Sequence, residues 1–170
     1  VVSANCEFPS NAYPWMRLSN RGVTFRMAEE RDGRVDFEDL AALVDDRTRV
    51  VALSWVQYAS GYRSDLRRIG QFCRERGIHF VVDGIQGLGA LPVDVERDNV
   101  DVITASAHKW LCGSEGIGLL YISDRVIDRI DPVKVGWTST RDWIKFGGFD
   151  LRYRDGAERF ECGTMNPFGI

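Results

Sequence analysis

Lys109 and Asp83 are the two residues whose types and spacing could support chemistry most directly. Lys109 lies in the run TASAHKWLCGSEGIGLLYIS, 26 residues after Asp83, which closes the apolar run HFVVD. A lysine amine can form a Schiff base with an aldehyde, and a carboxylate can keep a pyridine nitrogen protonated. Pyridoxal 5'-phosphate (PLP) contains both groups. The pair therefore predicts a site for this cofactor, provided that the two side chains share one pocket.

Strands that alternate with helices are expected to position these side chains. Four apolar runs are predicted strands: residues 49–56, 79–83, 101–107 and 116–123. The fourth follows the third so closely that it could run antiparallel. Helices are predicted with Asp36 as the N-cap of the first, and with Ser64 as the cap and Gly77 as the stop of the second. The pattern indicates an α/β fold, with a three-layer, mostly parallel sheet and helices on both faces.

The two ends of the chain are expected to be less regular. Residues 1–35 are predicted to be mostly irregular, although the first three residues resemble the tail of a strand. The last 40 residues alternate aromatics with glycines and are predicted to form long loops with short elements. Their aromatic side chains are expected to contact a second subunit: Trp137, Trp143, Phe146, Phe149, Tyr153 and Phe160.

Polar side chains follow three of the predicted strands. Ligands of open α/β sheets bind at the carboxyl ends of the parallel strands. The side chains expected at that edge are Gln57, Tyr58, Asp83, Gln86, Ser106, His108 and Lys109. Each has an ordinary structural explanation by itself, such as an aspartate that forms a turn. Together they fit one ligand, because they offer an acid for a pyridinium nitrogen, an amide for a phenolic oxygen, donors for a phosphate and an amine.

Several separated segments resemble the class V aminotransferase group of fold-type I PLP enzymes. This group includes cysteine desulfurases, selenocysteine lyases and isopenicillin-epimerase-like proteins. The segments are VDGIQGLGALPVDV, SAHKW, GSEGIGLLYIS and RFECGT, together with EFPSNAYPW and SWVQYASGYRSDL. They occur in the family's order. The resemblance implies that residues 1–170 are the central part of the PLP-binding large domain, an incomplete fold without the family's N-terminal part and C-terminal small domain.

The resemblance also implies roles for three side chains of the cofactor site. Lys109 would form the Schiff base with PLP and then shuttle the proton at the substrate's α-carbon. Asp83 would pair with the pyridinium nitrogen, which keeps the ring an electron sink. Gln86 would donate a hydrogen bond to the phenolic oxygen of the ring.

The remaining implied roles concern the phosphate and the subunit interface. Ser106 and His108 would hold the phosphate. Gly163 and Thr164 look like the pair that reaches the phosphate of the neighbouring subunit, so the resemblance implies a homodimer with the site at its interface. Tyr58 stands where desulfurases of the family usually have an asparagine, which points away from a standard desulfurase.

Two functions of different classes follow from these implications. The first is a PLP-dependent enzyme that acts on a small amino acid by transamination, desulfuration or epimerisation. The alternative is a non-catalytic fragment or interaction module that retains the fold and half the pocket. The family's ring-stacking residue, substrate-carboxylate arginine and catalytic cysteine are expected outside residues 1–170, so the isolated chain is expected to be inactive.

Composition and motif spacing argue against other partners. The net charge is -3 without a basic stripe, which argues against nucleic acid, and no apolar run approaches the roughly 18 residues that span a bilayer. The four cysteines are scattered and are expected to be buried free thiols in a reducing cytoplasm. A dinucleotide fingerprint is disfavoured because Pro92 replaces its third glycine. A zinc site is disfavoured because His79 and His108 lie 29 residues apart.

Overall fold

A six-stranded sheet organises the chain in a computed structural model that describes residues 1–168. The strands are β1 (Val2–Ala4), β2 (Arg26–Ala28), β3 (Val50–Ser54), β4 (His79–Asp83), β5 (Val102–Ser106) and β6 (Gly118–Ile122). Their order across the sheet is β2-β1-β3-β4-β5-β6. All neighbouring pairs are parallel except β5 and β6, which pair antiparallel. The predicted strands are confirmed, and so is the reversed direction of the last one.

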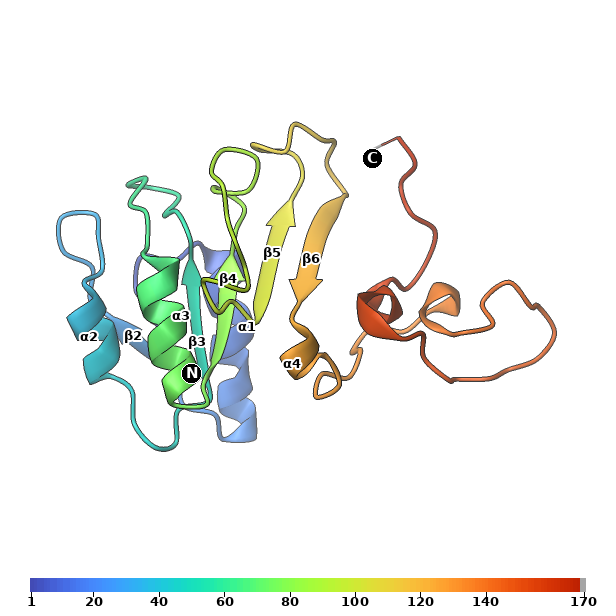
Figure 1. Cartoon of the computed structure of the whole chain (residues 1–170), viewed down its shortest axis with the longest axis horizontal. Coiled ribbons are helices and arrows are strands. Elements are labelled where there is room, and N and C mark those ends of the chain that lie inside the picture. Colours follow the sequence, from blue (N-terminus) through green and yellow to red (C-terminus); the bar gives the residue numbers. More distant parts are fainter. Residues whose placement is uncertain (169–170) are drawn as a thin grey trace.

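Helices cover both faces of this sheet. They are α1 (Pro9–Arg17), α2 (Phe37–Ala42), α3 (Leu66–Glu75) and α4 (Asp124–Ile127), with 3-10 turns η1 (Leu18–Arg21), η2 (Trp137–Ser139) and η3 (Gly156–Phe160). Figure 1 shows α2 and α3 in front of the sheet and α1 behind it. This arrangement confirms the predicted three-layer α/β fold.

The start of α3 differs from the prediction by one residue. Asp65, not Ser64, is the N-cap, and its carboxylate accepts a hydrogen bond from the backbone N–H of Arg68 at 3.0 Å. The hydroxyl of Ser64 instead donates to the carbonyl of Ser54 at 3.0 Å. Both residue types can cap a helix, so the tertiary contact of Ser64 with β3 decides between them. Gly77, with φ of 65°, follows the helix as expected.

The first 35 residues are more regular than predicted. They contain β1, α1 and β2, so the prediction of mostly irregular structure is wrong. Pro9 occupies the first turn of α1, where a missing N–H costs no helical hydrogen bond, and Pro14 lies inside the helix. The short strand β1 forms because β2 and β3 flank it on both sides. The three residues of β1 are too few to show a strand pattern in the sequence, so the strand could not be predicted from them.

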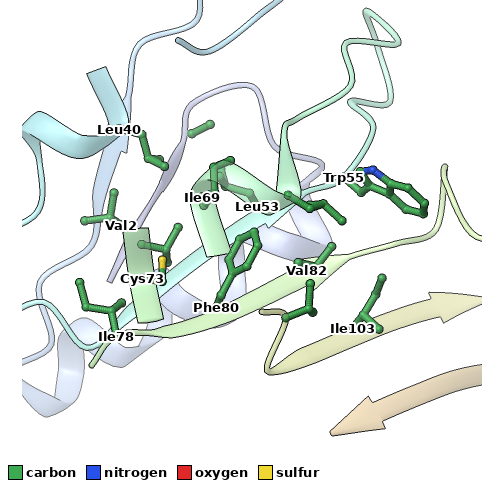
Figure 2. Close-up of a cluster of buried hydrophobic side chains, with 14 of the residues drawn as sticks. Val2, Leu40, Leu53, Trp55, Ile69, Cys73, Ile78, Phe80, Val82 and Ile103 are labelled. Carbon is green, nitrogen blue, oxygen red and sulfur yellow. The ribbon is translucent and has the colours of Figure 1, made fainter. Parts of the chain in front are cut away.

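The core lies between the sheet and α3. Phe80 and Val82 of β4 are fully buried, and Leu53 of β3 is nearly so. Ile69 and Cys73 of α3 belong to the same cluster (Figure 2). Burial raises the pKa of the Cys73 thiol to about 12, with a smaller contribution from Asp101. The central strands thus pack into the core, and Asp83 and Ser106 lie at the carboxyl ends of two of them.

The C-terminal segment forms loops with short 3-10 turns, as predicted. The Trp137 and Trp143 rings lie 5.3 Å apart, while Phe146 and Phe149 are exposed. Their predicted contact with a second subunit stays a prediction. None of the helices within residues 1–168 combines the length and the apolarity that a membrane crossing requires.

All four cysteines are free, as predicted. Cys73 is buried and Cys6 is half-buried. Cys112 and Cys162, however, are exposed, so the expectation of burial is wrong for these two.

Candidate active site

A cavity of about 540 Å³ lies at the carboxyl ends of β3, β4 and β5. Six residues that the sequence assigns to the ligand edge line this cavity: Tyr58, Asp83, Gln86, Ser106, His108 and Lys109. They come from the carboxyl ends of parallel strands and from the loops that follow β3, β4 and β5. The parallel direction of the strands brings these strand ends to one edge, which is the usual position of a ligand site in this architecture.

Asp83 and Lys109 face this cavity from adjacent strands. Asp83 is the last residue of β4, where it pairs with Ser54 on one side and Thr104 on the other. Lys109 follows the end of β5 by three residues and is half-buried. The backbone N–H of Cys112 donates to the carbonyl of Lys109 at 3.0 Å, which closes a tight turn directly after the lysine.

The pKa of Asp83 lies above its ordinary value. Burial is the main cause, and the negative charge of Glu7 raises the pKa further. The backbone N–H of Ile85, which donates to the Asp83 carboxylate at 3.0 Å, and the positive charge of Lys109 act in the opposite direction. Burial disfavours the charged form of an acid, so a cation bound in the cavity would stabilise the charged carboxylate of Asp83.

Three cavity residues at the start of α1 were not anticipated from the sequence. Phe8, Ser10 and Asn11 line the cavity beside the strand ends. The ring of Phe8 meets that of Tyr58 edge to face, with centroids 5.3 Å apart. A ring-stacking residue was expected outside the chain, yet Phe8 places an aromatic side chain at the cavity. Pro9, a first-turn signal directly after Phe8, could have revealed a helix starting at this edge.

Glu7 anchors the start of α1 to the end of β3. Its carboxylate is buried and accepts hydrogen bonds from the Ser54 backbone N–H at 2.8 Å and the Ser54 hydroxyl at 2.5 Å. The side-chain amides of Gln57 and Asn11 donate to it at 2.8 Å and 2.7 Å. Gln57 was expected at the ligand edge, but this bond turns it away from the cavity lining. Glu7 itself was missed because its partners lie far along the sequence.

Gly163 and Thr164 do not line the cavity. Gly163 lies in the C-terminal segment, where its carbonyl accepts a hydrogen bond from the Thr138 hydroxyl at 3.4 Å. Their expected role involves the site of a neighbouring subunit. That role stays a prediction.

A slightly larger cavity elsewhere in the described chain lacks the candidate site residues. A cavity of about 590 Å³ lies in the C-terminal segment, with walls that include Trp137, Trp143 and Phe146. It contains none of the candidate site residues. Residues 1–168 contain no group of three or more histidine, cysteine or acidic side chains that could hold a metal ion. The cavity at the sheet edge is therefore the candidate active site.

The groups around this cavity suit PLP. Its volume lies within the roughly 300–1,000 Å³ of typical small-molecule sites. An acid at one strand end can pair with a protonated ring nitrogen, and a primary amine lies at the next strand end. The hydroxyl of Ser106 and the imidazole of His108 are donors suited to a phosphate. Charge and donor type thus match an anionic cofactor with a basic ring.

Known proteins resemble this chain over its whole length. The whole chain, residues 1–170, matches the family model described as Aminotransferase class-V. A probable cysteine desulfurase of Methanothermobacter thermautotrophicus is 34% identical over 171 residues, which cover all of this chain and 42% of that protein. The chain thus spans about two fifths of the length of this relative.

Solved structures share the fold. An apo cysteine desulfurase from Thermococcus onnurineus NA1 superposes with a TM-score of 0.86 at 31% identity, covering 99% of this chain and 42% of that one. The cystine C–S lyase C-DES, in complex with its product cysteine persulfide, superposes with a TM-score of 0.85 at 29% identity. That match covers 96% of this chain and 44% of C-DES. A lysine-to-alanine mutant of C-DES carries glycine covalently linked to its PLP cofactor, and its TM-score is 0.83.

Proposed function

The chain belongs to the aminotransferase class-V family, and from this premise we propose that its protein binds PLP in the sheet-edge cavity and acts on a small amino acid. The observation that carries the proposal is that Asp83 and Lys109, at the ends of adjacent strands, line one cavity. When bound, PLP supplies an aldehyde that condenses with amines and a ring that accepts the electron pair released at an α-carbon.

Lys109 and Asp83 have the two central roles in this proposal. The Lys109 amine would attach the cofactor when no substrate is bound, and once the substrate amine has taken its place, the freed Lys109 amine would accept and return the proton of the substrate α-carbon. The Asp83 carboxylate holds a proton on the ring nitrogen. Because burial and Glu7 raise the pKa of Asp83, its charged form gains from a cationic partner. The negative charge of Glu7, added to that of Asp83, strengthens this preference for a cation.

The other cavity residues orient the ligand. Gln86 donates to the phenolic oxygen of the ring, and Ser106 and His108 donate to the phosphate. Phe8 and Tyr58, whose rings are in contact, form an aromatic wall beside the strand ends.

A homodimer completes the site in this proposal. Gly163 and Thr164 of one subunit reach the phosphate in the cavity of the other. Their position outside the cavity of their own chain is compatible with this role.

We propose transamination, desulfuration or epimerisation as the reaction, because each would use a lysine amine to move the α-carbon proton of an amino acid. The relatives favour cleavage of a carbon–sulfur bond, because they include cysteine desulfurases and the cystine C–S lyase C-DES. Tyr58 replaces the asparagine that desulfurases usually have near the ring. We therefore propose a sulfur-containing amino acid as substrate, with a contact on the phenolic side that differs from that of a standard desulfurase.

Borohydride trapping tests the attachment point. The chain contains three lysines, Lys109, Lys134 and Lys145, so Lys134→Ala and Lys145→Ala are matched controls for Lys109→Ala. The full-length protein is loaded with PLP, reduced with borohydride and mapped by peptide mass spectrometry. We expect the pyridoxyl group on Lys109 in the wild type and in both controls. Lys109→Ala should lose the label and about 10²–10⁴-fold of the activity, the typical contribution of such a group.

The opposite outcome selects the alternative function. A pyridoxyl group on another lysine, or wild-type protein without label, would refute the assignment of Lys109. It would favour a non-catalytic interaction module that retains only the fold.

A further inference from the structure

Trp110, the residue after Lys109, makes a hydrogen bond that determines how Gln86 faces the cavity. Its indole N–H donates to Oε1 of Gln86 at 3.2 Å. An indole can only donate a hydrogen bond, whereas a side-chain amide has an accepting oxygen on one side and a donating nitrogen on the other. The amide oxygen of Gln86 must therefore face Trp110. Its NH₂ group remains for the cavity that Gln86 lines.

The loops that carry these two residues are in direct backbone contact. Gly89 has φ of 92°, and a Cβ atom there would lie only 2.4 Å from the carbonyl oxygen of Trp110. A Cβ at Gly87 would lie 2.2 Å from the ring of Trp55. The loop after β4 is thus packed between the Trp55 ring and the main chain of Trp110. This close packing fixes the position from which Gln86 reaches toward Trp110.

We propose that Trp110 is a positioning residue that makes Gln86 present a hydrogen-bond donor, and not an acceptor, to the cavity. The inference rests on the proposed function and deepens it. A donor at this point selects a ligand oxygen that carries negative charge, such as the phenolic oxygen of the PLP ring. Trp110 therefore controls the ionisation of the bound ligand without touching it.

Removal of the indole N–H is expected to release the amide. In Trp110→Phe an aromatic ring still covers the loop, but the amide of Gln86 can turn by 180° and present its oxygen to the ligand. Two oxygens would then face each other, which disfavours the negatively charged form of the ligand. Loss of the donor raises the pH at which the ligand loses its proton.

The test is a pH titration of the visible absorbance of PLP bound to the full-length protein. In Trp110→Phe we expect the midpoint to rise by roughly 0.3–1 pH unit, the effect of one hydrogen bond. We also expect PLP affinity to fall by about 2–10-fold. Trp15→Phe, which removes an indole from α1, serves as the matched control and should leave both quantities unchanged.

A double-mutant cycle separates positioning from a general packing effect. If Trp110 acts through Gln86, Trp110→Phe should add no shift of the midpoint in a Gln86→Ala background. An equal shift in both backgrounds would overturn the proposal. So would an unchanged midpoint in the Trp110→Phe single mutant.

A second measurement does not depend on the cofactor. In apo protein labelled with ¹⁵N-tryptophan, the indole N–H signal of Trp110 should move and exchange faster with solvent in Gln86→Ala. An unchanged Trp110 signal would refute the hydrogen bond itself. Failure of PLP to bind the wild type would instead refute the proposed function, while this signal would still test the hydrogen bond between Trp110 and Gln86.

Discussion

Asp83 lies between two charges of opposite sign at the end of β4. Glu7 raises its pKa and Lys109 lowers it, but burial has the largest effect and leaves the pKa raised. A half-buried acid with a raised pKa is unfavourable for folding at neutral pH, because its charged form has lost hydration. The residue is therefore better explained by ligand binding than by stability.

Asp83→Asn is accordingly expected to stabilise the apo protein at neutral pH. The stability contribution of an acid with a raised folded-state pKa is present below its ordinary pKa and is lost as the pH rises through the raised value. Asparagine does not titrate and can still accept the hydrogen bond from Ile85. We expect a melting temperature about 1–3 °C higher at pH 8 and a smaller difference near pH 4, measured by scanning calorimetry.

The same substitution should weaken PLP binding, since it removes the partner of the ring nitrogen. Asp46→Asn, at an exposed aspartate, provides the control and should change neither property. A lower melting temperature for apo Asp83→Asn at pH 8 would show that the carboxylate stabilises the fold and would contradict this explanation.

At the scale of elements, α3 is fixed against the loop that leads into β5. Gly70 lies within α3, and a Cβ atom there would be 1.9 Å from the carbonyl oxygen of Asp98. The backbone of the loop thus packs directly on the helix. This contact helps to set the distance between α3 and the strands whose ends form the cavity.

Gly70→Ala is therefore expected to change the unfolding free energy in two opposite ways. Alanine favours a helix over glycine by about 1 kcal/mol, whereas overpacking against a main-chain carbonyl typically costs about 1–3 kcal/mol or more. The contact at Gly70 is so short that we expect overpacking to prevail, with a net loss of roughly 1–3 kcal/mol of unfolding free energy. Equilibrium denaturation in urea measures this loss.

Gly148→Ala is the matched control for this prediction. A Cβ atom at Gly148 would meet nothing within 4 Å, so the change should stay within about 0.5 kcal/mol. A Gly70→Ala protein as stable as the wild type would show that the loop yields to the added methyl group.

At the scale of the whole molecule, the 170-residue chain presents large apolar side chains to solvent. Phe146 is 84% exposed and Phe149 fully exposed, and Leu119 and Leu120 of the edge strand β6 are about half exposed at 46% and 40%. Exposed apolar side chains and an uncovered edge strand both favour association. A second subunit would cover such surface in the proposed homodimer.

The isolated chain is therefore expected to self-associate. At about 10–100 μM it should elute ahead of a monomer in size-exclusion chromatography with light scattering, and it should bind the dye ANS. Substitution of Phe146 and Phe149 by serine should reduce both effects. A monodisperse monomer without dye binding would contradict the expectation.

The apolar runs of the chain predict the central strands and the polar residues at their carboxyl ends. The apolar run that became β3 is buried on both faces, whereas β4 and β5 bury every second residue and leave the others half-buried or exposed. All three runs are apolar enough to be predicted as strands from the sequence. Because parallel strands end at one edge, the positions of Asp83, Gln86 and Lys109 after these runs also predict a shared pocket.

Tertiary structure alone decided the N-terminal elements and the anchoring of the site. The buried carboxylate of Glu7 bonds to Ser54 and Gln57, 47 and 50 residues away, and no local pattern encodes such a contact. The choice of Asp65 over Ser64 as the cap of α3 likewise depends on β3. The periodicity of apolar residues depends only on residues close together along the chain, so it can predict a helix or a strand. The hydrogen-bond partners of a buried polar group are instead chosen by whichever distant segment folds against it.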